Sequence, residues 1–208
     1  MSSQYGQKAW TEPIGAQIFE LIYTDRADYP TKIASQLNTN TQTVSNYVEG
    51  LEEVNIIVRK DQSERRQRYK ADLSLLVHNW YEMVKNELVE RVEYWEETGD
   101  DERADEISNI LDDFKENEDQ ILFFAEDYLN EVFDDHKERN TVTTMSLYEL
   151  LREEFVFSAM YTYLNNPGLY DEGLEWFKAL YQALMVWGTA EKGRTVPIMQ
   201  DLLNEELE

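Results

Sequence analysis

The alternation of hydrophobic and polar positions in the first third of the chain predicts three short helices followed by a β-hairpin. Apolar residues recur at helical spacing in residues 13–23, 31–38 and 42–54. Two strand-like runs, 56–60 and 65–71, flank the polar segment DQSE, which is suited to a turn. The expected order of elements is therefore helix, helix, helix, strand, strand.

Local signals agree with these helix boundaries. Pro13 suits a first helical turn, and the hydroxyl groups of Thr31 and Thr41 are suited to capping the helices that begin beside them. Asn55 follows the third helix, where a residue in the left-handed conformation is expected to end it.

The rest of the chain reads as helix, so the expected fold class is mainly α. Six segments have helical periodicity: 73–97, 103–116, 119–135, 146–164, 170–187 and 195–208. Residues 136–144 read as a loop and NNPG, at 165–168, as a turn. We place the domain boundary after Asp72, which separates an N-terminal domain, 1–72, from a helical domain, 73–208.

Charge is distributed unevenly along the chain. Of the formal net charge of −24, residues 73–208 carry −23 and residues 1–72 carry −1. Within 56–70, six basic residues accompany two acidic ones. The overall acidity favours a surface adapted to multimolar salt, the alternative being an acidic face that binds a basic partner or mimics nucleic acid. A uniformly salt-adapted surface would not spare one segment, whereas a phosphate-binding surface would, because DNA affinity comes largely from Lys and Arg.

Several other classes of protein are excluded by composition. There is no cysteine, hence no disulfide framework and no thiolate site. The N-terminus lacks a signal-peptide pattern, and no apolar run reaches the length of a membrane span, so a cytoplasmic protein is expected.

Candidate catalytic and metal-ligating residues are few. His78 and His136 are the two histidines of the sequence. His78 and Glu82 are four residues apart and could share a metal, but such a pair is more typical of a solvated helix face. No glycine-rich phosphate loop, nucleophile elbow or HExxH motif is present. We therefore expect neither an enzyme nor a cofactor or metal site.

The segment IASQLNTNTQTVSNYVEGLEEVNIIVRK, residues 33–60, resembles the helix-turn-helix of ArsR- and MarR-type transcriptional regulators. The matching features are an Ile-Ala-x-x-Leu run in the second helix, Thr-Val-Ser early in the third, and a hydrophobic strand that opens a wing. The run RRQRYKA matches the returning wing strand. Over about residues 10–72, the resemblance implies an N-terminal winged helix-turn-helix with a two-stranded wing. Together with the acidity, it implies a regulator from a halophilic archaeon or one of its mobile elements.

The sequence departs from the family pattern in two ways. Asn55 stands where these families often have Gly. Glu49, Glu52 and Glu53 add negative charge to the third helix, so we expect the DNA-facing side to be narrow and these glutamates to point away from it.

The resemblance implies a sequence-specific regulator of transcription, and a repressor is favoured because promoter occupancy alone is sufficient. In such motifs the third helix reads base edges of double-stranded DNA in the major groove, while basic wing residues hold phosphates or enter the minor groove. The expected DNA-binding residues are Lys32, Thr41, Gln42, Thr43, Ser45, Asn46, Tyr47, Arg59, Lys60, Arg65, Arg66 and Arg68. The alternative is a DNA-organising or protein-interaction module that uses the same fold as a scaffold.

The helix after the wing resembles the dimerisation helix of these regulators, which implies a homodimer on a two-fold site. The expected interface residues are Val77, Trp80, Val84, Leu88, Val92 and Trp95. The alternative is that this stripe packs within its own chain. The aromatic side chains of 146–187 have three open readings: ordinary core, a pocket for a small-molecule effector, or a surface for a protein partner.

Overall fold

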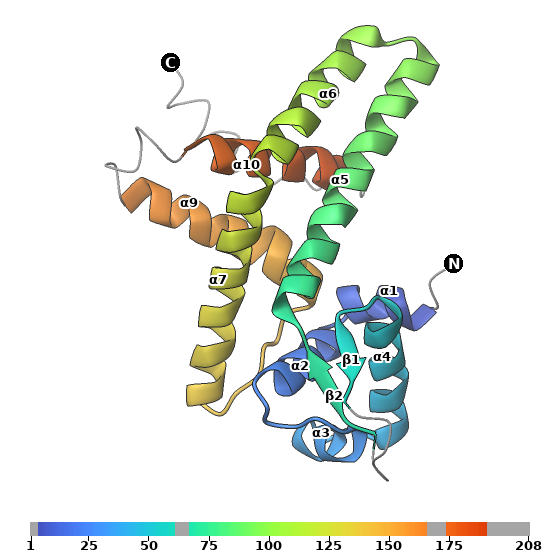
Figure 1. Cartoon of the computed structure of the whole chain (residues 1–208), viewed down its shortest axis with the longest axis vertical. Helices are drawn as coiled ribbons and strands as arrows, with labels where there is room; N and C mark the ends of the chain where they lie inside the picture. The colour runs from blue at the N-terminus through green and yellow to red at the C-terminus, as the bar shows by residue number, and fades with distance from the viewer. Residues whose placement is uncertain (1–3, 61–66, 166–173, 191–208) are drawn as a thin grey trace. The chain divides into compact units, whose positions relative to one another are not determined.

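The computed structural model describes residues 4–60, 67–165 and 174–190 (Figure 1). The described chain is mainly helical and contains one small antiparallel sheet, which agrees with the expected mainly α class. Within these ranges no helix combines the length and the apolar composition that crossing a bilayer requires.

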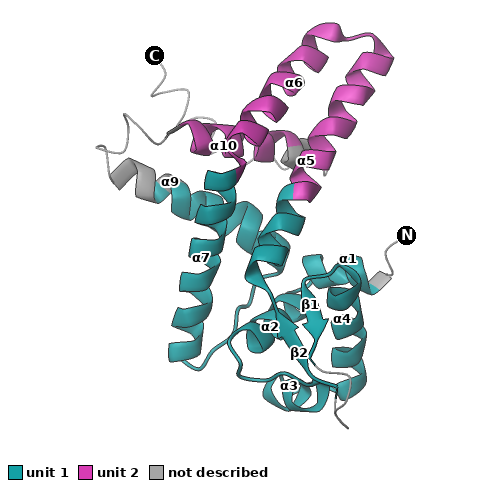
Figure 2. Ribbon diagram, in the orientation of Figure 1, with its two compact units in different colours: residues 1–81, 119–170 teal, residues 82–118, 171–208 magenta. Residues whose placement is uncertain are grey.

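The chain divides into two compact units (Figure 2). One unit is formed by residues 1–81 and 119–170, the other by residues 82–118 and 171–208. This division differs from the boundary expected after Asp72. The reason is that α5 (Leu73–Thr98) belongs to both units, and the chain returns to the first unit at residue 119.

Four helices open the first unit: α1 (Gln4–Thr11), α2 (Pro13–Tyr23), α3 (Pro30–Gln36) and α4 (Thr41–Glu53). The last three confirm the helices predicted from periodicity. The sequence pattern did not predict α1, which contacts both α2 and α4. Because Pro13 is the first residue of α2, its missing N–H removes no hydrogen bond from the helix.

The helix ends show which capping predictions hold. Asn40, not Thr41, caps α4, because its side chain accepts a hydrogen bond from the Thr43 N–H at 2.7 Å. Thr31 does not cap α3 either, because that helix begins at Pro30. Asn55 has a φ of 59°, which confirms the left-handed residue expected after α4.

The sheet consists of β1 (Ile57–Arg59) and β2 (Tyr69–Ala71), with Val58 opposite Lys70. This confirms an antiparallel hairpin between 56 and 71, although both strands are shorter than expected. β2 is also bonded on its other side, where the Tyr69 N–H donates to the Asp28 carbonyl oxygen at 2.8 Å. The connection between α2 and α3 is thereby joined to the edge of the sheet.

The core of this N-terminal region comes from the predicted apolar faces. Ile18 and Leu21 of α2 are at most 1% exposed, and Val44 and Leu51 of α4 are fully buried. α1 approaches α4 closely because Gly50 has no side chain: a Cβ there would overlap the Tyr5 carbonyl group. Backbone-to-backbone packing of this kind requires Gly at the contact.

The first unit is completed by α7 (Glu118–Glu138), α8 (Leu147–Glu149), the π-helical segment η1 (Leu150–Glu154) and α9 (Phe155–Asn165). α8, η1 and α9 together form the helical run predicted at 146–164. α8 contacts both α1 and α2. Trp80 of α5 packs edge to face on Phe155 of α9, with the ring centroids 6.0 Å apart.

The second unit contains the later part of α5, α6 (Asp101–Glu116) and α10 (Leu174–Ala190). α6 buries Ala104, Ile107, Leu111 and Phe114 and contacts α10. These helices confirm the segments predicted at 103–116 and, from residue 174 onward, at 170–187. The helix predicted at 195–208 lies outside the described residues, as does most of the NNPG turn.

Candidate nucleic-acid interface

Helix α4 has three sides: one packs into the core, one faces outward and one is covered by the N-terminal segment. Its core side carries Val44, Val48 and Leu51, which are at most 1% exposed. Its outward side begins with Thr41 and Gln42, both exposed, and continues with the half-buried Ser45. The small polar groups expected to read DNA are therefore accessible at the N-terminal half of the helix.

The third side of α4 is covered by α1 and by the residue that follows it. Tyr47 is 5% exposed, packs edge to face on Tyr5 with the centroids 5.9 Å apart, and donates its hydroxyl to Glu12. Burial, followed by this hydrogen bond, raises the pKa of the Tyr47 phenol. Asn46 donates to the Tyr5 hydroxyl at 3.0 Å.

One of the expected DNA contacts, Tyr47, is corrected by this packing. Tyr47 cannot reach a groove, because its ring is enclosed between α4 and the N-terminal segment. Asn46 is half-buried: it donates to Tyr5 and accepts a hydrogen bond from Gln42 at 2.9 Å, and its contact with DNA stays a prediction. Thr43 is half-buried. The exposed polar residues at this end of α4, which we call its outward probe, are Thr41 and Gln42, and Ser45 is half-buried like Thr43.

The glutamates of α4 share the outward side with these polar residues, contrary to the expectation that they point away. Glu49 and Glu53 are exposed and Glu52 is half-buried. Seven residues make about two helical turns, so Glu49 lies on the same side as Gln42. The seven-residue spacing in the sequence could have indicated that Glu49 shares a side with Gln42. Any groove contact must therefore be made by the first turns of the helix.

Three described cations of the hairpin, Arg59, Lys60 and Arg68, lie near carboxylates. Arg59 of β1 donates to Glu52 of α4 at 2.8 Å, which brings the wing beside the outward side of α4. This hydrogen bond raises the pKa of Arg59 above its ordinary value. The amino group of Lys60 lies 3.4 Å from an Asp28 carboxylate oxygen and 3.5 Å from an Asp25 carboxylate oxygen. Arg68 lies 3.6 Å from the same oxygen of Asp28.

The remaining predicted phosphate contacts divide into two groups. Lys32 is an exposed residue of α3, as expected. Arg65 and Arg66 lie outside the described residues. Lys70, which the prediction did not include, is exposed on β2, and its alternation with the buried Tyr69 in the strand would have indicated it.

The expected dimerisation stripe is largely core. Val77, Trp80, Val84 and Leu88 are each 0% exposed in the single chain, so these four side chains have no surface to offer a second copy. The alternative reading, packing within the chain, holds for them. The last two members of the stripe, Val92 and Trp95, are half-buried, and the Trp95 ring is covered in part by Arg103, 4.6 Å from its centroid.

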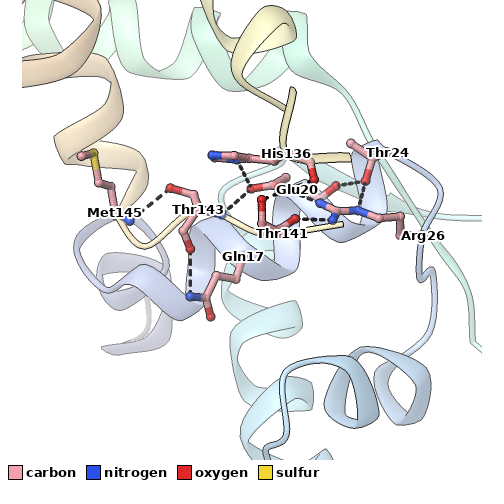
Figure 3. Close-up of polar contacts among 8 residues, drawn as sticks. All are labelled: Gln17, Glu20, Thr24, Arg26, His136, Thr141, Thr143 and Met145. Carbon is pink, nitrogen blue, oxygen red and sulfur yellow. Dashed lines mark hydrogen bonds and ion pairs between the residues drawn. The ribbon is translucent and has the colours of Figure 1, made fainter. Parts of the chain in front are cut away.

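A second polar cluster surrounds Glu20, whose side chain is completely buried (Figure 3). Its carboxylate pairs with Arg26, accepts the Thr143 N–H at 2.8 Å, and lies 3.2 Å from Nδ1 of His136. Gln17 donates to the Thr143 carbonyl oxygen at 2.9 Å. The cluster joins α2 to the loop after α7. Because every oxygen of the carboxylate is engaged by this chain, we assign it a structural role.

The aromatic side chains of the C-terminal part differ in exposure, some being buried and others exposed. Phe155 and Phe177 are buried in their respective units, as the core reading predicted. Phe157 and Tyr161 are 55% and 66% exposed, which suits the partner-surface reading. Tyr170 lies outside the described residues.

The two histidines lie apart from any cluster of metal-ligating side chains in the described part of the chain. His78 is exposed on α5, and within the described ranges no three His, Asp or Glu side chains converge as a metal site would require. His136 lies in the last turn of α7, the helix-end position expected for it. Searches with this sequence match neither a protein-family model nor a curated protein.

Proposed function

We propose that the chain is a winged-helix DNA-binding regulator of transcription, acting as a cytoplasmic repressor in a salt-adapted cell. The observation that carries the proposal is the joining of the basic hairpin to the polar side of α4. Arg59 of the wing contacts Glu52 two to three turns along the helix from Gln42. A polar probe and a row of cations are thus neighbours in a chain whose net charge is −24.

The element order supports the proposal further. Helices α2, α3 and α4 are followed by a hairpin, and Asp28, in the connection between α2 and α3, accepts a hydrogen bond from β2 at the sheet edge. In winged-helix proteins the third helix lies in the major groove with its N-terminal residues on base edges. The Asn40 side chain takes the Thr43 N–H, so the N–H groups of Thr41 and Gln42 are the ones that a phosphate could engage at this end, since a helix N-terminus favours anions.

Gln42 is the residue that we expect to read sequence. Its carboxamide can pair with an adenine edge through two hydrogen bonds. The hydrogen bond to Asn46 orients it, and Asn46 is in turn held by Tyr5. The reading group is therefore organised before DNA binds, which reduces the entropy lost on binding.

Selection of bound duplexes from a random pool at high potassium tests the proposal. Gln42→Ala should relax the base preference at one position, at a cost of about 1–3 kcal/mol against the preferred base. Arg68→Ala should weaken all sites alike and reduce the salt slope by up to about one. Gln120→Ala, an exposed amide on α7, serves as the control and should match the wild type. An unchanged base preference in Gln42→Ala would refute the assignment of the reading side.

A second candidate function follows from Glu49, Glu52 and Glu53. Three carboxylates on the outward side of α4 suit a basic protein partner, in which case the fold serves as a scaffold. The same selection separates the candidates. Enrichment of one site supports the regulator, equal binding of all duplexes supports a DNA-organising role, and no binding supports the protein scaffold.

The proposal includes a homodimer, since one winged-helix domain contacts only a short stretch of duplex and pairing two such domains increases avidity. The buried residues Val77, Trp80, Val84 and Leu88 do not form its interface. Light scattering of the wild type and of the Phe157→Ser variant tests whether the exposed aromatic side of α9 forms the dimer interface instead.

A further inference from the structure

Three cations of the proposed interface already face carboxylates of their own chain. Arg59 donates to Glu52 at 2.8 Å. Lys60 and Arg68 converge on one oxygen of Asp28, at 3.4 and 3.6 Å. These are the side chains that a DNA phosphate would engage, so each must leave or share its carboxylate when DNA binds.

Both carboxylates are held in place by the fold. Glu52 belongs to the last turn of α4. The Asp28 side chain is 16% exposed, and its backbone carbonyl accepts the Tyr69 N–H at 2.8 Å. Asp28 is therefore anchored to β2, within reach of both Lys60 and Arg68.

The cations, by contrast, are accessible to solvent. The side chains of Arg59, Lys60 and Arg68 are 48%, 37% and 46% exposed. Ion pairs of such exposure are weak and are screened by salt. A phosphate offers each cation an equivalent charge-assisted hydrogen bond, so an exchange of partners is energetically accessible.

We propose that Glu52 and Asp28 compete with backbone phosphates for these three cations, so that DNA binding exchanges one anion for another. This inference rests on the proposed function and concerns the regulation of the same site. In ordinary DNA binding, each neutralised phosphate releases about 0.9 of a bound cation, which makes affinity fall steeply with salt. Here the displaced carboxylates take up cations from solution, so the net release is smaller and the salt dependence is weaker.

A reduced salt slope has a physical advantage for a protein whose acidity is adapted to concentrated salt. A site that relied on counterion release alone would lose affinity by orders of magnitude as potassium rises. An internal exchange keeps the cations shielded when DNA is absent and lessens that loss. It also disfavours adventitious polyanions, which must displace the same carboxylates.

The test measures affinity for one selected duplex by fluorescence anisotropy over a potassium series, using the full chain. Glu52→Gln should raise affinity roughly two- to fivefold at the lowest salt and steepen the salt slope by up to about one ion. Asp28→Asn should steepen it by up to about one, because Lys60 and Arg68 both lose this carboxylate but Lys60 keeps the Asp25 carboxylate at 3.5 Å. Glu49→Gln is the matched control, since it removes one charge from the same side of α4 and Glu49 makes no ion pair among the described residues.

The outcomes separate the inference from the proposed function. A clear gain in Glu52→Gln with little change in Glu49→Gln supports the exchange. Equal gains in both variants, or unchanged slopes, overturn it while leaving DNA binding intact. Absence of binding in the wild type and in all variants overturns the proposed function and the exchange together. Circular dichroism melts identify any variant that fails to fold. If Asp28→Asn unfolds, Glu52→Gln, at the more exposed carboxylate, is sufficient to test the exchange.

Discussion

Replacement of Glu20 by Gln should destabilise the first unit strongly. The side chain of Glu20 is 0% exposed and that of Arg26 is 13% exposed, so their ion pair is shielded from water. Gln removes the charge and presents an amide N–H₂ group to partners that are themselves donors. Either the Thr143 N–H or the Arg26 guanidinium then loses its acceptor.

The magnitude follows from the loss of one member of a buried pair, which costs about 3–5 kcal/mol. Arg26 keeps a contact to the Thr141 carbonyl oxygen and a hydrogen bond to the Thr24 hydroxyl at 3.0 Å, so we expect the lower half of that range. For a domain of ordinary stability, about 5–15 kcal/mol, this is a substantial fraction.

The assay is urea denaturation followed by circular dichroism, together with amide hydrogen exchange of the peptide that contains Thr143. The control is Glu131→Gln, an exposed residue of α7, which should change the free energy of unfolding by no more than about 0.5 kcal/mol. The difference between the two variants should persist at high potassium, because a buried pair is poorly screened. Equal stability of the two variants, with unchanged exchange at Thr143, would refute the view that Glu20 fastens the loop to α2.

Three further predictions concern packing and pH. Gly50→Ala should lower stability by about 1–3 kcal/mol, because its methyl group meets the Tyr5 carbonyl, and a melting temperature equal to that of the wild type would contradict this contact. Leu88→Ala should cost about 2–5 kcal/mol in urea denaturation while leaving the oligomeric state unchanged in light scattering, whereas dissociation of a dimer would restore the interface reading. Burial raises the pKa of Tyr128, so the folded state holds this proton at pH values where the unfolded state has released it. Stability should therefore fall as pH rises above about 10, with a shallower fall in Tyr128→Phe, and equal pH profiles would refute the assignment.

Periodicity in the sequence predicted most of the helices, because burial of one side of a helix requires apolar residues at fixed spacing. It placed α2 at Pro13–Tyr23 without error, and it anticipated the left-handed Asn55 that ends α4. Capping was less predictable. Asn40 and Thr41 are adjacent and both suited to the role, and the path of the incoming chain decided between them.

The candidate site shows the limit of such reasoning more clearly. The polar character of α4 was readable, and so was the charge of the wing. The sequence pattern did not reveal that α1 would cover Asn46 and Tyr47, because α1 is short and its contact depends on Gly50 admitting a backbone. It also gave no sign that Asp28 would stand between Lys60 and Arg68, since these residues are 32 and 40 positions apart from it.

The sequence by itself determined the order of the elements from α2 onward, the apolar side of each predicted helix and the contrast between a nearly neutral first third and an acidic remainder. These are properties of spacing and composition, which operate locally along the chain. Only the tertiary structure decided which polar residues of α4 stay outward, which carboxylates the wing cations face, and that the stripe through Trp80 and Leu88 is core. The physical reason is that exposure and ion pairing are relations between distant segments, and such relations exist only after the segments have packed.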